Sequence, residues 1–209
     1  MTVITIASAF GLRGSHIGAT VARTFGIPFV DRAIPRAIAR DLGLPIETVM
    51  AQDGKAATGI WRIISAMAVI PDITGTEVMA HSMGADHATY KEKTEKIMLE
   101  TARSSGGVFV GRAGVLVLRE IPGALHVRLT GPREQRIAAF AAAKKISEKD
   151  AREVVETIDK ARAAYGRTLY RTDLTDDSLY DLVLSEARFG EEATAELITT
   201  AARARDRSR

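Results

Sequence analysis

Short apolar runs alternate with longer amphipathic segments along the whole chain. Buried strands are predicted where β-branched and apolar residues are contiguous, at 2–6, 27–31, 108–110, 125–129 and 181–184. Helices are predicted where apolar side chains recur three or four residues apart, at 17–25, 32–42, 46–53, 59–70, 86–103, 113–118, 133–145, 148–165 and 190–203. Strands separated by helices form parallel sheets that are covered on both faces. The pattern therefore predicts an α/β protein with three α/β/α layers and a five-stranded parallel sheet.

The segment between the first strand and the first helix has the layout of a phosphate-binding loop. It reads Ala9-Phe10-Gly11-Leu12-Arg13-Gly14-Ser15-His16. Main-chain amides at such a loop point outward, and the dipole of the following helix favours an anion there. The pattern G-x-x-x-x-G-K-[ST] is incomplete, because Ala9 replaces the first glycine, Ser15 the lysine and His16 the hydroxyl residue.

Two interpretations of this loop remain open. In the first, the main chain from Gly11 to Ser15 binds phosphate, Arg13 supplies a cation in place of the lysine, and the Ser15 hydroxyl helps to hold a metal ion. In the second, the segment is an ordinary tight turn between a strand and a helix. The order of the strands favours a site, because ligands of such sheets bind beyond the carboxyl ends of the strands.

Other polar residues are expected at the same edge of the sheet, because they follow predicted strands directly. Asp31 ends the second strand, and Arg112 follows the third. Asp31 is a candidate ligand for an acceptor substrate, but it is equally a candidate N-cap for the helix over 32–42. Arg112 is a candidate for binding the same substrate, or for a structural ion pair with Asp31 or Asp159.

Composition limits the classes of function. The chain has 209 residues, of which 46% are hydrophobic and 26% are charged, and it contains no cysteine, which excludes disulfides and thiolate chemistry. The net charge of +3 does not indicate a nucleic-acid partner. The apolar stretch 59–73 is interrupted by Arg62 and too short to cross a bilayer. We therefore expect a soluble cytoplasmic protein with no membrane or nucleic-acid partner; Trp61 and its apolar neighbours belong to the core or to a homo-oligomer contact.

Basic residues outnumber acidic ones between Arg128 and Arg171, in the region predicted to form a helical hairpin. For most of them a solvated helix surface with ion pairs one turn apart is the simpler explanation. Four arginines are candidates for phosphate binding, because a planar guanidinium group matches phosphate oxygens. They are Arg133, Arg136, Arg162 and Arg167. A surface ion pair between Asp159 and Arg162 is the alternative at that position.

The order and spacing of several segments resemble those of the phosphate-loop nucleoside monophosphate kinases, and in particular the cytidylate kinase-like family. The segments are Ile4-Thr5-Ile6-Ala7-Ser8, Gly26-Ile27-Pro28-Phe29-Val30-Asp31-Arg32, Val108-Phe109-Val110-Gly111-Arg112, Arg133-Glu134-Gln135-Arg136-Ile137, Ile158-Asp159-Lys160-Ala161-Arg162 and Tyr180-Asp181-Leu182-Val183-Leu184-Ser185. The resemblance covers nearly the whole chain. It implies one P-loop kinase-like domain over 1–209, with a helical acceptor-binding insertion at 36–90, a helical lid at 132–172 and a frayed basic tail at 203–209.

The resemblance also implies roles for individual residues. The loop residues Gly11, Leu12, Arg13, Gly14, Ser15 and His16 would hold ATP, with Ser15 near Mg²⁺. The acceptor would contact Asp31, Arg36, Arg112 and Asp159. The arginines Arg13, Arg133, Arg136, Arg162 and Arg167 would neutralise the phosphoryl group in transfer.

Two functions follow from the sequence. The first is transfer of the γ-phosphoryl group of ATP to a nucleoside monophosphate, with cytidine monophosphate expected from the family. The second is a catalytically impaired relative that binds a nucleotide or a phosphorylated metabolite as a sensor or an assembly module. The missing lysine and hydroxyl of the loop, at Ser15 and His16, keep the second function open.

Overall fold

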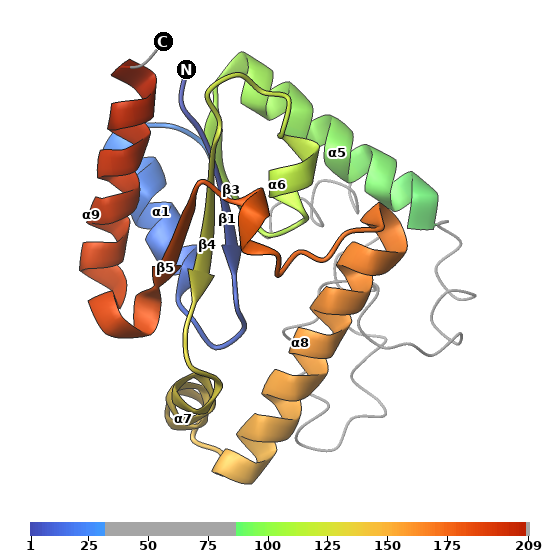
Figure 1. Ribbon diagram of the computed structural model, residues 1–209, viewed down its shortest axis with the longest axis vertical. Coiled ribbons are helices and arrows are strands. Elements are labelled where there is room, and N and C mark those ends of the chain that lie inside the picture. The colour runs from blue at the N-terminus through green and yellow to red at the C-terminus, as the bar shows by residue number, and fades with distance from the viewer. Residues whose placement is uncertain (32–86, 208–209) are drawn as a thin grey trace.

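The computed structural model describes residues 1–31 and 87–207. Within this part of the chain a five-stranded sheet forms the centre of the molecule, with the strand order β2-β3-β1-β4-β5 (Figure 1). The strands are β1 (Val3–Ser8), β2 (Phe29–Val30), β3 (Gly107–Val110), β4 (Leu125–Thr130) and β5 (Leu182–Ser185). Every pairing is parallel, so all carboxyl ends lie at one edge. The predicted α/β class and the parallel sheet are confirmed.

Helices cover both faces of this sheet. Figure 1 shows α1 (Gly14–Phe25) and α9 (Glu186–Arg207) on one side, and α5 (His87–Ser104) and α6 (Gly114–Val117) on the other. Alternation along β1 explains why both faces are apolar, because successive side chains of a strand point to opposite sides. Ile4 belongs to the core beneath α1 and α9, whereas Val3 belongs to the core beneath α5 and α6.

A third apolar core lies beyond the carboxyl edge, in the hairpin of α7 (Arg133–Lys144) and α8 (Glu148–Tyr170). Phe10 of the loop after β1 is part of this core, and its ring meets Phe140 edge-on with centroids 5.0 Å apart. The Ser147 hydroxyl caps α8 by accepting a hydrogen bond from the N–H of Asp150 at 3.1 Å. The hairpin is therefore packed directly against the loop.

Two helices are longer than the sequence predicts. α8 continues to Tyr170 instead of ending near 165, and it stops where Arg171 adopts a left-handed conformation with φ of 52°. α9 continues to Arg207, so residues 203–207 are helical rather than a frayed tail. A hydrogen bond of 2.9 Å from Arg205 to Asp181 ties the end of α9 to the residue before β5. Long-range contacts of this kind extend the helix beyond its apolar stripe.

Several sequence predictions fall outside the described residues. These are the helices over 32–42, 46–53 and 59–70, the candidate Arg36 and almost all of the insertion expected at 36–90. In residues 1–31 and 87–207, each helix is too short or too polar to span a lipid bilayer.

Candidate functional site

The loop between β1 and α1 is held in a tight turn at the carboxyl edge. Gly11 has φ of +87°, a conformation that favours glycine, and the N–H of Leu12 donates to the Ala9 carbonyl at 3.3 Å. A Cβ atom placed on Gly14 would lie 2.5 Å from the Cβ of Ser8, so that position has no room for a side chain. The turn therefore favours glycine at position 11 and requires it at position 14, the one glycine of the motif that the loop retains.

The first turn of α1 presents main-chain donors that the fold itself does not use. Within the described chain, the N–H groups of Gly14, Ser15 and His16 have no hydrogen-bond acceptor. Arg13 occupies the N-cap position, and its side chain does not cap the helix. Unpaired amides and the helix dipole make the start of a helix attractive to an anion. The arrangement required for phosphate binding through the main chain is present.

Arg136 of α7 ties the loop to the helical hairpin. Its guanidinium group donates to the carbonyl of Phe10 at 2.8 Å and to the Asp159 carboxylate of α8 at 2.9 Å. It also donates to the Gly131 carbonyl at 3.3 Å, and only 9% of its side chain is exposed. Arg136 is therefore a buried candidate arginine whose guanidinium group is bonded to the loop, to the residue after β4 and to α8.

Arg162 of α8 also contacts this region but stays exposed. It donates to the Ser8 carbonyl at 2.6 Å, and its guanidinium carbon lies 5.6 Å from the centre of the Phe10 ring. Arg136 donates to a carbonyl of the loop and Arg162 to the last carbonyl of β1, so the hairpin holds the loop through its carbonyl groups and leaves the amides at the start of α1 unused.

The other loop side chains face α9 rather than the hairpin. Arg13 forms an ion pair of 3.1 Å with Glu191, and the Nδ1 atom of His16 lies 3.9 Å from the same carboxylate. Burial raises the pKa of the neighbouring Glu186 carboxyl, while Arg13 acts in the opposite direction. Arg13 and His16 of the loop are therefore both held near acidic side chains of α9, which no local sequence pattern indicates.

The remaining candidates are distributed around the same edge. Arg133 forms an exposed ion pair with Glu156 on the outer surface of the hairpin. Arg167 lies on the exposed surface of the last turns of α8, close enough to Asp173 to lower its pKa, although hydrogen bonds from Thr175 lower it more. Asp31 directly follows β2, and Arg112 lies two residues after the end of the neighbouring strand β3.

The contribution of Phe10 could not be predicted from the motif, although a large aromatic residue in a glycine-bearing loop is unusual enough to be a signal. The structure groups it with Arg136, Arg162 and Asp159 around the loop. The contact partner Glu191 lies 178 positions from Arg13 in the sequence, and no local pattern connects the two.

A family model described as the cytidylate kinase-like family matches residues 3–188. The chain is also 29% identical over 119 residues to a uronate isomerase of Corynebacterium glutamicum. That match covers 57% of this chain but only 23% of the longer protein.

Solved structures show the same fold at low sequence identity. An uncharacterized protein from Eubacterium ventriosum aligns with a TM-score of 0.70 at 15% identity, covering 97% of this chain and 98% of that one. Shikimate kinase from Bacteroides thetaiotaomicron aligns with a TM-score of 0.51 at 11% identity, covering 96% and 97%. TT1252 from Thermus thermophilus gives 0.52 at 14% identity, covering 97% of both chains. The fold is that of the P-loop kinases.

Proposed function

Because the chain belongs to the cytidylate kinase-like family, we propose that it is an ATP-dependent phosphotransferase whose acceptor is a nucleoside monophosphate. The observation that carries this proposal is the set of unpaired amides of Gly14, Ser15 and His16 at the carboxyl edge of the sheet. Main-chain donors can bind the phosphates of ATP without the lysine that the motif lacks.

The arginines divide into two roles in this proposal. Arg136 is a positioning residue, because it is buried and its donors already bind Phe10, Gly131 and Asp159. Arg162 is exposed and can turn from the Ser8 carbonyl to a phosphate oxygen. Transfer of a phosphoryl group depends mainly on positioning and on neutralising charge, and an exposed guanidinium group beside main-chain amides can supply both.

A magnesium ion would supply further neutralisation of the phosphate charge when bound. In residues 1–31 and 87–207 there is no cluster of three or more acidic or histidine side chains for a metal. Mg²⁺ does not need such a cluster, because in kinase sites it keeps several waters and takes most of its remaining ligands from phosphates. The hydroxyl of Ser15, half-buried at the start of α1, is the residue we propose to lie closest to the ion.

Cytidine monophosphate is the acceptor that the family suggests. Asp31 and Arg112 follow neighbouring strands at the carboxyl edge, so both lie on the β2 and β3 side of the loop. We propose that they contact the acceptor together with Arg36, and that Asp159 acts mainly through Arg136, to which it is bonded.

A coupled assay of ADP release tests the proposal. The full chain is supplied with ATP, Mg²⁺ and each of the common nucleoside monophosphates in turn, and turnover with cytidine monophosphate is expected. Arg162→Ala should lower kcat/KM by at least about tenfold, equivalent to about 1.4 kcal/mol of transition-state stabilisation. Arg23→Ala is the matched control, because Arg23 lies on α1 and bonds only to Thr20 within the described chain. Absence of turnover with every acceptor would overturn the proposal.

One observation favours a second function, which is nucleotide binding without turnover. Ser15 stands where a catalytic lysine is usual, and the nearby cation Arg13 is paired with Glu191. Isothermal titration calorimetry with a non-hydrolysable ATP analogue separates the two functions. Binding without activity toward any acceptor would support a sensor or assembly module, and absence of both would exclude both functions.

A further inference from the structure

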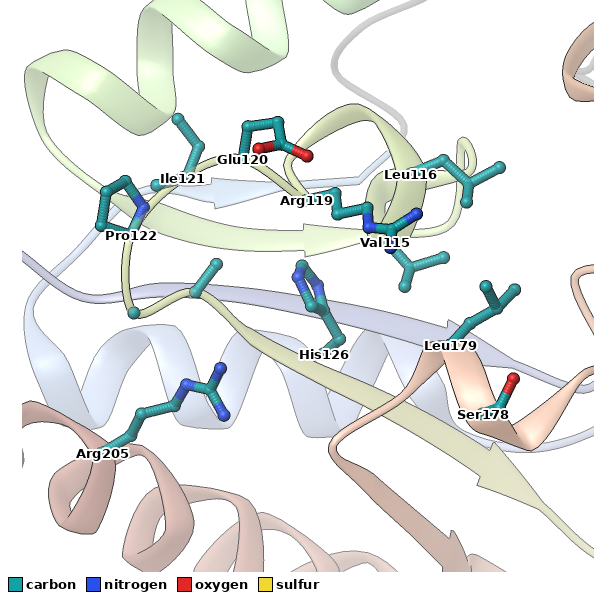
Figure 2. Close-up of a pocket in the computed structure, with 12 residues that line it drawn as sticks. Val115, Leu116, Arg119, Glu120, Ile121, Pro122, His126, Ser178, Leu179 and Arg205 are labelled. Atoms are coloured by element: carbon teal, nitrogen blue, oxygen red, sulfur yellow. The ribbon is translucent and has the colours of Figure 1, made fainter.

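A cavity of about 300 Å³ lies beside the first half of β4 (Figure 2). Its walls come from α6, the turn that leads into β4, the 3₁₀ helix η2 (Asp177–Leu179) and the end of α9. The volume is at the lower end of the range for pockets that bind small molecules. Val115, Leu116 and Leu179 supply apolar surface.

Two arginines bring cationic donors to this cavity. Arg119 is exposed on the turn after α6, and no carboxylate of the described chain pairs with it. Arg205 of α9 donates from Nη1 to Asp181, but its Nε atom is buried and has no hydrogen-bond partner among the described residues. An unpaired buried donor is destabilising, and an oxygen atom of a ligand would satisfy it.

A buried histidine lies between these two guanidinium groups in Figure 2. His126 is only 8% exposed, and its Nδ1 atom lies 2.8 Å from the hydroxyl of Thr5. When Thr5 donates to Nδ1, the neutral ring carries its proton on Nε2 and offers a third donor. Burial lowers the pKa of His126, so the ring is neutral at neutral pH.

We propose that this cavity is a second binding site, for a small organic anion with one phosphate or carboxylate group. The anionic group lies between Arg119 and Arg205, and the carbon skeleton lies against Val115 and Leu179. Glu120 is also part of the lining, and Asp181 offsets part of the Arg205 charge, so the site suits a ligand of low total charge.

The proposal is independent of the proposed kinase function. The cavity is lined by residues at the start of β4, whereas the phosphate loop follows the end of β1. Because the parallel strands put these at opposite edges, occupation of one site leaves the other accessible.

Nuclear magnetic resonance of the ¹⁵N-labelled full chain distinguishes the two sites. Phenyl phosphate and benzoate carry the same apolar ring with different anionic groups, and each is titrated to about 10 mM at pH 7. We expect saturable shifts of the Gly123, Ser178 and Leu179 amides with at least one of these probes. The Gly11 and Gly14 amides report on the phosphate loop separately.

Three variants test whether the two probes bind in this cavity. Arg119→Ala should weaken binding at least about tenfold without unfolding the protein, because Arg119 has no ion pair in the described chain. Arg205→Lys keeps a cation for Asp181 but removes the Nε donor, and should weaken binding several-fold. Arg203→Ala is the control on the same helix, since Arg203 contacts Phe25 and does not line the cavity. The absence of shifts with both probes, or equal affinity in Arg119→Ala, would overturn the proposal.

Discussion

The two edges of the sheet use different parts of the polypeptide to offer hydrogen-bond donors. At the carboxyl edge the unused donors are main-chain N–H groups of Gly14, Ser15 and His16. At the amino edge the N–H of His126 already donates to Asp181 at 2.8 Å, and the unused donors belong to side chains. A site made of main-chain donors tolerates side-chain substitution, so the proposed phosphate site does not depend on the lysine that the motif lacks.

Arg136→Ala gives the largest expected effect, because it removes the connection between the loop and the hairpin. The carbonyl of Phe10 and the carboxylate of Asp159 both lose a donor. We expect the free energy of unfolding to fall by about 2–3 kcal/mol, less than for a fully buried pair because Asp159 is partly exposed. Urea denaturation followed by circular dichroism measures this change. A loss below about 0.5 kcal/mol would show that Arg136 does not hold the loop.

Gly14→Ala tests whether the carboxyl edge works through its main chain. The added methyl group would lie 2.5 Å from Ser8, so the loop and the first turn of α1 must separate. We expect nucleotide affinity to fall at least about tenfold, or about 1.4 kcal/mol, in calorimetry.

Ser15→Ala is the matched comparison for Gly14→Ala. It removes the side-chain hydroxyl next to Gly14 and leaves the main chain of the loop in place. In the absence of Mg²⁺ it should bind nucleotide within about twofold of the natural sequence. Equal losses in both variants would mean that the Ser15 side chain, rather than the main-chain amides, carries the binding.

The amino edge should respond to pH through His126. Burial lowers the pKa of the folded His126 below its ordinary value of 6.5, so the unfolded chain takes up this proton more readily. The contribution of His126 to stability is therefore fully present above pH 6.5 and decreases as the pH falls below it. Urea denaturation at pH 7, 6 and 5 measures the change.

His126→Gln is the control for the pH experiment, because glutamine does not titrate and keeps a polar group opposite Thr5. The difference in unfolding free energy between the natural sequence and this variant should shrink on acidification. A difference that stays constant from pH 7 to pH 5 would contradict the assignment of this pH dependence to His126.

Arg133→Ala should have the smallest effect of these changes. Arg133 is on the same helix as Arg136, but its ion pair with Glu156 is exposed, with 49% of the arginine side chain accessible. Exposed ion pairs contribute about 0–1 kcal/mol. We expect a change below about 1 kcal/mol in the urea experiment, and a loss equal to that of Arg136→Ala would remove the distinction between the two arginines.

The sequence alone predicts the α/β class, the strands and the loop, because these depend on local periodicity and on the sites of glycine. The position of Asp31 and Arg112 after predicted strands follows from the same information, whereas the pairing of those two strands is seen only in the structure. The lengths of α8 and α9 are not predictable in this way, since α9 is extended by the contact of Arg205 with Asp181.

Among the candidate arginines, only the tertiary structure separates those that hold the loop from those at the surface. In sequence, Arg133 and Arg136 are one helical turn apart and chemically identical. In space, Arg136 donates to a carbonyl 126 positions away, while Arg133 meets a carboxylate on an exposed surface. The cavity beside β4 likewise depends on α6, η2 and α9 meeting at that strand. Local sequence patterns determine which elements form, whereas the environment of each charged group depends on residues that only the folded chain brings together.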